Sequence, residues 1–210
     1  KQAKDTTKQV KDTTDLMNAL EKEAASGDSI SYTIATFKTT RLINGHTVQN
    51  LAKGVLDVKI SHRFGTLGGS QGGSYNLYGL DNATMRMGFD YGINRYLMVG
   101  IGRSTYKKTY DAFFKLKLLR QSTGKRNMPF TLSYIPTIAI ETLRPPSDRK
   151  NYFSSKLSFT QQLIIGRKFS ESTSLQLMPS FVHYNLVELG RDASNLFSIG
   201  IGGRQKLSKR

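Results

Sequence analysis

The feature that most constrains this chain is a succession of segments, each about ten residues long, in which apolar and polar residues alternate. Residues 55–64 are the clearest example, because Leu56 and Val58 share one face while Asp57 and Lys59 share the other. The same pattern recurs in residues 83–91, 96–104, 111–118, 130–141, 156–165, 174–184 and 197–202. A tilted strand of ~9–11 residues crosses a bilayer. The alternation therefore predicts an all-β chain with about eight antiparallel strands.

The connections between these segments differ in length. Residues 92–95 and 169–173 read as short turns, whereas residues 65–82, 142–152 and 185–195 are longer and rich in Gly, Pro, Asn and charge. Alternation of tight turns with long loops is typical of outer-membrane barrels. Residues 121–128 are the exception, since strand order places them on the turn side although they are not tight. We expect an up-and-down transmembrane β-barrel with Arg210 at the periplasmic end.

Alternation alone does not say which face points inward. Three features favour an apolar exterior. The polar face is rich in small residues such as Gly88, Gly100 and Gly102, which suit a crowded interior. It also carries charges of both signs, which can pair across a lumen. Aromatic residues sit near the strand ends, where the girdles of membrane barrels lie; they are Phe64, Tyr91, Tyr96, Tyr106, Tyr110, Phe130, Tyr152, Phe169, Tyr184 and Phe197.

The N-terminal residues differ from the rest. Residues 1–29 are polar and Thr-rich, with one short amphipathic stretch after Asp15, so we expect a flexible or short-helical segment. A frayed tail is the simpler interpretation, and docking in the periplasm or plugging a lumen is the alternative. From about Ile30 the pattern changes to period two and reaches a turn signal at Asn44-Gly45. The barrel domain is therefore assigned to residues 30–210.

Composition narrows the classes of function. The chain has no cysteine, which excludes disulfides and thiolate metal sites. Its 31 Lys and Arg against 15 Asp and Glu are spread along the chain without a nucleic-acid-binding motif. Outer-membrane lipid, lipopolysaccharide phosphates or anionic solutes are equally good partners for this charge, which alone does not choose among them. Because no such motif is present, we expect no nucleic-acid partner. No signal peptide is visible at Lys1, and no apolar run is long enough for a spanning helix.

The charges of the polar face are the only candidate site. The alternation points a basic set toward the lumen, namely Lys59, Arg63, Arg86, Lys115, Lys117 and Lys156, and an acidic set, namely Asp57, Asp90 and Asp111. Charged rings in a pore raise the local concentration of counter-ions. One hypothesis is therefore a passive, porin-like pore with a net basic lumen for small anionic solutes. The alternative is that these charges pair within a blocked lumen, in a non-conducting scaffold or accessory subunit that binds a periplasmic or outer-membrane partner protein.

No enzymatic constellation is found, so we expect no catalytic residue, cofactor or metal. Ser61 and His62 are adjacent in a strand and face opposite sides, so they cannot act as a nucleophile and its base. His62 and His183 fall near the same ends of different strands without an acidic partner, which makes a poor metal site. The Gly-rich residues 68–74 lack the Gly-Lys-Ser/Thr ending of a phosphate loop and read as an outer loop.

Several stretches resemble a family of bacterial outer-membrane β-barrels of unknown function that is common in Bacteroidetes. They are TFKTTRLINGH at 36–46, KGVLD at 53–57, ISHRFG at 60–65, GLDNATMR at 79–86, GIGRS at 100–104, KTYD at 108–111, LLRQSTG at 118–124, RKNYFSS at 149–155 and LQLMP at 175–179. The resemblance covers roughly residues 15 to 210. It implies a barrel in the bacterial outer membrane and implies no activity, since that family has no established catalytic residues.

Strand number is the remaining expectation. Members of that family usually continue beyond the point where this sequence stops, and Lys206-Leu207-Ser208-Lys209 repeats the turn pattern of Lys168-Phe169-Ser170-Glu171. Eight strands form an allowed closed barrel, but we expect these eight to be the N-terminal part of a larger one. Side chains fill an eight-stranded barrel, so a pore becomes plausible only with more strands.

Overall fold

The computed structural model describes residues 29–69, 73–81, 83–143, 152–187 and 193–207, and its main element is one antiparallel sheet of eight strands. The strands are β4 (Leu56–Arg63), β5 (Thr84–Gly92), β6 (Leu97–Ser104), β7 (Thr109–Leu119), β9 (Thr131–Glu141), β10 (Leu157–Lys168), β11 (Thr173–Tyr184) and β12 (Asn195–Gln205). Each strand pairs with the next of this set along the chain. The eight predicted strands and the all-β, up-and-down order are therefore confirmed.

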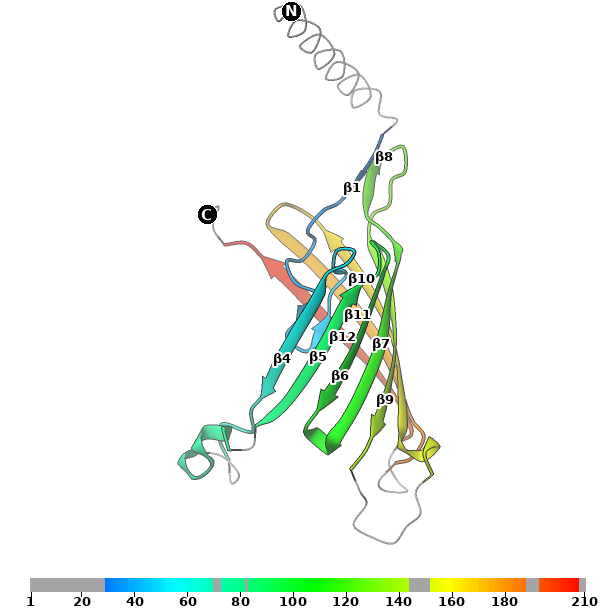
Figure 1. Cartoon of the computed structure of the whole chain (residues 1–210). Coiled ribbons are helices and arrows are strands. Elements are labelled where there is room, and N and C mark those ends of the chain that lie inside the picture. Colours follow the sequence, from blue (N-terminus) through cyan, green and yellow to red (C-terminus); the bar gives the residue numbers. More distant parts are fainter. Residues whose placement is uncertain (1–28, 70–72, 82, 144–151, 188–192, 208–210) are drawn as a thin grey trace, which may run out of the picture.

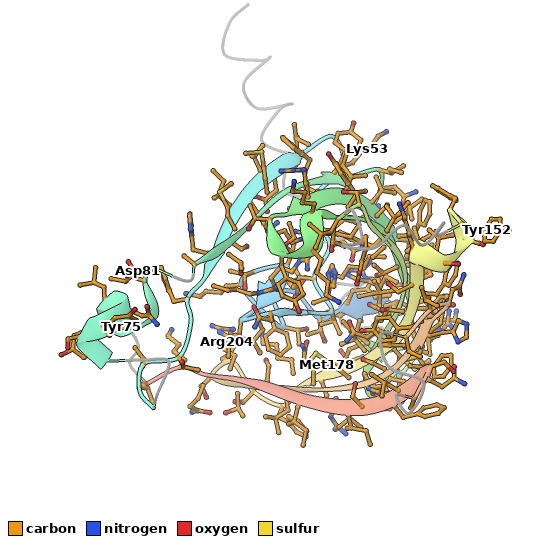
Figure 2. All side chains as sticks on the ribbon, turned by 90° about the horizontal axis from the view of Figure 1, so that it is seen from below. Lys53, Tyr75, Asp81, Tyr152, Met178 and Arg204 are labelled. Atoms are coloured by element: carbon orange, nitrogen blue, oxygen red, sulfur yellow. The ribbon has the colours of Figure 1, made fainter. Side chains whose placement is uncertain are left out.

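The sheet is strongly curled, and its two edge strands are β4 and β12. Viewed from below, the strands curve around a central space that other parts of the chain occupy (Figure 2). The architecture is thus that of a partial β-barrel. Within the described ranges, no helix combines the length and the apolar character needed to cross a membrane.

The two ends of the sheet differ as the connection lengths predict. Residues 93–96 and 169–172 make tight turns at one end, which we call the turn end. At the other, which we call the loop end, residues 64–83, 142–156 and 185–194 connect the strands, with the short 3-10 helices η1 (Gly73–Gly79) and η3 (Ser154–Lys156) among them. The loop end also holds the short connection between β6 and β7, with η2 (Tyr106–Lys108).

The connection that did not fit the alternation of lengths builds a small separate sheet. Residues 120–130 contain β8 (Ser122–Gly124), which projects from the turn end and pairs with β1 (Ile30–Tyr32) in an antiparallel two-stranded sheet (Figure 1). This pairing explains why the connection is not a tight turn. The expectation of a flexible or helical segment falls on residues 1–29, of which 1–28 lie outside the described residues.

The period-two pattern after Ile30 does not produce a strand of the barrel. After β1 the chain turns back into the curve of the sheet, where only β2 (Arg41–Leu42) and β3 (Gly45–His46) are extended. We call residues 33–54 the plug segment. Composition favours strands here, but tertiary packing overrides that preference because the backbone lies against the inner face of the sheet instead of pairing along its edge.

The hairpin within the plug segment turns one residue earlier than Asn44-Gly45. Leu42 pairs with Gly45, so Ile43 and Asn44 form the turn, and Ile43 has a φ of 54°. A β-branched residue in that region is strained. The shift places Gly45 against β11, where a Cβ would lie 3.3 Å from Met178 Sδ. Close approach of the hairpin to β11 accounts for this register.

Candidate functional site

The two faces of the sheet have opposite character. Outward side chains are apolar and exposed, with Leu56, Val58 and Ile60 each more than half exposed on β4. Inward side chains include Asp90, Lys115 and Ser133, each with a relative exposure of 0%. A water-soluble sheet would place its apolar face inside, so the apolar exterior predicted from the sequence matches the structure. A continuous apolar exterior of this extent suits a bilayer.

The inner face of the sheet is covered by the plug segment. Phe37 and Val48 of the plug segment are buried in one cluster with four inward residues of the sheet; these are Met98, Phe113, Ile135 and Ile164. The last four interrupt the polar pattern of the inner face, and their apolar character at inward positions was the available sequence signal for a covering segment. The core of the molecule thus lies between the plug segment and the sheet.

Two glycines in the strands make room for the plug segment. A Cβ on Gly166 of β10 would lie 2.6 Å from Val48 Cγ1, and a Cβ on Gly202 of β12 would lie 2.6 Å from Leu42 Cδ2. Both distances are far below van der Waals contact, so the strand backbones and the plug side chains touch directly. Glycine within a strand often marks such a close approach.

Lys115 anchors the plug segment to β7. Its side chain is buried, and its Nζ donates to the backbone carbonyl of Gln49 and, over 3.5 Å, to that of Thr40. Both carbonyls belong to the plug segment, on either side of the β2–β3 hairpin. A buried ammonium needs such acceptors because it has left water. Lys115, which the sequence predicts to point inward, therefore links β7 to the plug segment through hydrogen bonds.

Asp90 is the centre of a second charged contact. Its carboxylate accepts from Lys59 Nζ at 3.0 Å and lies 3.8 Å from Arg41 Nη2, while its side chain is only 1% exposed. Lys59 also pairs with Asp57 on the same strand. Arg41 comes from the plug segment, and its guanidinium carbon lies 5.1 Å from the ring centroid of Phe113. Sequence reasoning missed Arg41, because its contact with β5 arises only from the fold of the plug segment.

Arg86 and Asp111 form a third pair, on β5 and β7. Arg86 Nε donates to Asp111 Oδ1 at 2.8 Å, and Nη2 pairs with Oδ2. The guanidinium crosses the intervening strand β6 at Gly102, where a Cβ would lie 2.2 Å from Nη2. This geometry explains why a glycine stands between the two charges.

The other three predicted basic residues are not gathered with these pairs. Arg63 is exposed at the end of β4, where its Nε donates to Asn44 Oδ1 at 3.3 Å. Lys117 lies near the turn end and lines a cavity of about 120 Å³ beside the plug segment. Lys156 belongs to η3, outside the strands, so its predicted strand position was wrong.

The three histidines occupy unrelated surroundings. His46 is buried in the plug segment, edge-on to Phe113 at 4.6 Å between ring centroids, and its carbonyl accepts from Gln176 Nε2 at 2.8 Å. Burial, with the nearby charges of Arg41 and Lys115, holds the pKa of His46 well below its ordinary value. His62 stacks on Phe64, and His183 Nδ1 lies 2.7 Å from Asn195 Oδ1. The described residues contain no group of three or more His, Asp or Glu side chains that could hold a metal ion.

Comparison with known proteins agrees with this geometry. No curated protein and no solved structure matches the chain. The family model described as "Membrane bound beta barrel domain (DUF5777)" matches residues 37–210, which include the plug segment from Phe37 onward and all eight strands of the sheet. An apolar exterior, a filled polar interior and this match lead to one assignment: the chain belongs to the family of membrane-bound β-barrel domains.

Proposed function

We propose that this chain is an outer-membrane β-barrel domain whose interior is closed by its own plug segment, and that it acts as a non-conducting scaffold. The observation that carries the proposal is the buried contact of Lys115 with two carbonyls of the plug segment. A buried ammonium group that donates its hydrogen bonds to the protein's own backbone is not available to bind solutes. The proposal therefore favours the blocked-lumen alternative over the pore.

Two further inward cations support the same conclusion. Lys59 is neutralised by Asp57 and Asp90, and Arg86 is neutralised by Asp111. Paired charges at short range leave little net field for steering anions. Val48 and Phe37 fill the space between with apolar side chains that are at most 4% exposed. A continuous water path along the inner face is therefore not expected while the plug segment is in place.

The bacterial outer membrane is the proposed location, in agreement with the resemblance to a Bacteroidetes family. Barrels with outward apolar bands and aromatic ends are the membrane proteins of that compartment. Exposed aromatic residues lie at both ends of the sheet, with Tyr91 and Phe169 at the turn end and Tyr110 and Phe197 at the loop end. The edges β4 and β12 must find backbone partners in a bilayer. Closure by further strands, or by pairing of the two edges, is part of this proposal.

The absence of cysteine allows a direct test of the plug. A Cβ on Gly166 would lie 3.5 Å from Val48 Cβ, which is within the range of about 3.5–4.5 Å for a disulfide. The double variant Val48→Cys/Gly166→Cys should therefore cross-link under oxidising conditions and lock the plug segment. The control pair Val48→Cys/Gly88→Cys places the second thiol on β5, so it should not cross-link.

Planar-bilayer conductance then decides the function. We expect the full chain to show no channel steps, with the lock oxidised or reduced. Channel steps that are seen in the wild-type protein and also in the oxidised double variant would overturn the proposal. The plug segment would then not close the lumen even when it is locked in place.

A gated passage for small anions is the second candidate, and the imperfect polar packing of the plug segment favours it. Several of its buried polar atoms have no hydrogen-bond partner among the described residues; they are Thr40 Oγ1, Arg41 Nε and both amide atoms of Asn50. Each such atom costs about 1–3 kcal/mol, which weakens the hold of the plug. Steps seen only after reduction of the locked variant, with preference for chloride over potassium, would establish this candidate instead.

The scaffold role requires a partner, and the β1–β8 sheet is where we propose that it binds. β1 pairs with β8 along one edge, and the described residues offer no strand to its other edge. An exposed edge can take up a strand from another protein. A photo-cross-linking residue at Ser31 should capture a periplasmic protein in intact cells, whereas the same residue at Tyr75, at the loop end, should not capture that protein. Equal capture from both positions would contradict the assignment.

A further inference from the structure

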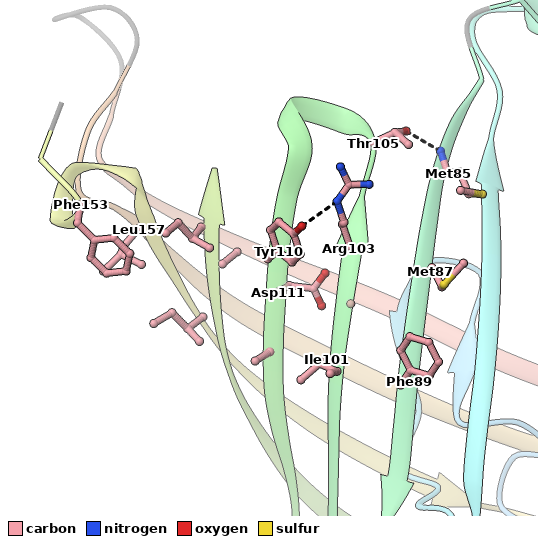
Figure 3. A pocket seen from close by; sticks show the side chains of 15 residues that line it. Met85, Met87, Phe89, Ile101, Arg103, Thr105, Tyr110, Asp111, Phe153 and Leu157 are labelled. Atoms are coloured by element: carbon pink, nitrogen blue, oxygen red, sulfur yellow. Dashed lines mark hydrogen bonds between the residues drawn. The ribbon is translucent and has the colours of Figure 1, made fainter. Parts of the chain in front are cut away.

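The outer face of the sheet carries a groove that the scaffold role does not use. Its volume is about 610 Å³, and it lies over β5, β6, β7, β9 and the start of β10 near the loop end (Figure 3). Ala112 forms part of its floor, because its register partners on the neighbouring strands, Ile101 and Ile138, have much larger side chains. Phe153 and Leu157 form one side wall, and Phe89 lies at the opposite side. The hollow thus results from a small residue among large ones on the membrane-facing surface.

The groove has one polar end. Arg103, Thr105 and Tyr110 line it toward the loop end, and apolar side chains continue from there toward the middle of the sheet. Arg103 Nε donates to the hydroxyl of Tyr110 at 3.1 Å, and its guanidinium carbon lies 5.5 Å from the centroid of that ring. Tyr110 therefore holds the arginine at the mouth of the groove.

Arg103 has no anionic partner among the described residues. Within the described parts of the chain, its side chain makes no ion pair, and its two terminal nitrogens make no hydrogen bond. A guanidinium on the lipid-facing surface is costly unless it reaches the headgroup region and meets a negative charge there. The guanidinium fork matches the geometry of a phosphate. Exposed Lys108 in the adjacent η2 adds a second positive charge near this end.

We propose that this groove is a binding site for a phosphorylated acyl lipid, with the phosphate on Arg103 and an acyl chain lying over Ala112. The charge of the mouth and the apolar character of the floor together match an amphiphile with an anionic head. Given the proposed outer-membrane location, on which this inference rests, the loop end lies at the outer leaflet. The lipid assigned to the site is therefore the lipid A portion of lipopolysaccharide.

The test is retention of lipid by the full chain in detergent, measured by native mass spectrometry after addition of bis-phosphorylated lipid A. We expect one lipid A molecule to be retained per chain. Arg103→Ala should weaken retention by about tenfold, the value of one charge-assisted contact. Arg103→Lys should keep part of it. Ala112→Phe should abolish retention with the arginine in place, because the ring fills the floor.

A matched control exists at the opposite end of the sheet. Arg167 is also exposed and also lies over an aromatic ring, with its guanidinium carbon 5.0 Å from the centroid of Phe169, but the groove is not there. Arg167→Ala should leave retention unchanged. Equal losses in the Arg103 and Arg167 variants, or none in Ala112→Phe, would show general adsorption to basic residues and overturn the site.

Two further lipids identify the source of the phosphate. Phosphatidylglycerol and phosphatidylethanolamine are added in place of lipid A, and weaker retention of both supports the assignment. Preference for phosphatidylglycerol that depends on Arg103 would overturn lipid A as the ligand. None of these outcomes alters the disulfide lock or the conductance, since the groove and the plug segment lie on opposite faces. Failure of the lipid site and failure of the closed interior are therefore distinguishable.

Discussion

Arg86 and Arg103 lie on neighbouring strands, each in register with a residue adjacent to the other, and yet they face opposite sides of the sheet. Arg86 points inward and finds Asp111. Arg103 points outward, and among the described residues its guanidinium contacts the hydroxyl and ring of Tyr110. On the inner face, Lys59, Arg86 and Lys115 all find oxygen acceptors within the chain, whereas Arg103 on the outer face has no carboxylate or carbonyl acceptor among the described residues. Inward charges therefore hold the plug segment to the sheet, whereas the outward charge of Arg103 faces the membrane.

The largest expected effect comes from Asp90→Ala. Removing this carboxylate leaves the buried guanidinium of Arg41 without its partner, which costs about 3–5 kcal/mol in unfolding free energy. The neighbouring outward substitution Phe89→Ala should cost about 1 kcal/mol, because lipid still covers the site. Both are measured by urea unfolding in lipid vesicles, with the folded and unfolded bands separated on gels, since the chain has no tryptophan. Equal losses would erase the distinction between the faces.

Gly166→Ala should have the next largest effect. Its new Cβ would lie 2.6 Å from Val48 Cγ1, so the plug segment must shift at a cost of about 1–3 kcal/mol. Val48→Ala removes the methyl groups that clash and leaves a 3.5 Å contact with the Cβ, so the double variant should recover most of the loss relative to Val48→Ala alone. A double-mutant cycle measures this coupling. Strict additivity would show that the plug segment does not rest on β10.

The sequence predicted the strands far better than the plug. Period-two alternation is a local signal, so Val58 and Lys59 suffice to assign opposite faces on β4. The contacts of the plug segment are long-range, and nothing local links Arg41 to Asp90 or Val48 to Gly166. The alternation places Asp90 and Lys115 on the polar face, but it does not give their partners, because a carbonyl acceptor such as that of Gln49 carries no sequence signature. The groove on the outer face was not predicted for the same reason, since nothing in the sequence marks Ala112 before the fold places Ile101 and Ile138 on either side of it.

The third prediction concerns pH and the inner face. Because the folded pKa of His46 lies below its ordinary value, the unfolded chain takes up a proton first as the pH falls. Stability from this residue is therefore complete above the ordinary pKa of ~6.5 and is lost as the pH falls from there toward the lowered pKa, at about 1.4 kcal/mol per pH unit. Unfolding from pH 8 to pH 5 should show this slope. His46→Phe should flatten it, whereas His62→Phe, on an exposed histidine at the end of β4, should not; a slope unchanged in His46→Phe would contradict the prediction.

The smallest effect is expected at the loop end of the sheet, at an exposed ion pair. Lys107 Nζ lies 3.5 Å from Glu141 Oε1 across the loop end, and the carboxylate side chain is 43% exposed. Exposed pairs contribute between about 0 and 1 kcal/mol, and salt screens them. Glu141→Gln should therefore change the unfolding free energy by less than about 0.5 kcal/mol, and that change should vanish in concentrated salt. The same salt series should leave the loss in Asp90→Ala nearly intact, because buried charges are screened much less. A salt-insensitive loss in Glu141→Gln would mean that the ion pair at the loop end is as well shielded from solvent as the charges around the plug segment. The difference between buried and exposed charges would then not coincide with the difference between the interior and the loop end.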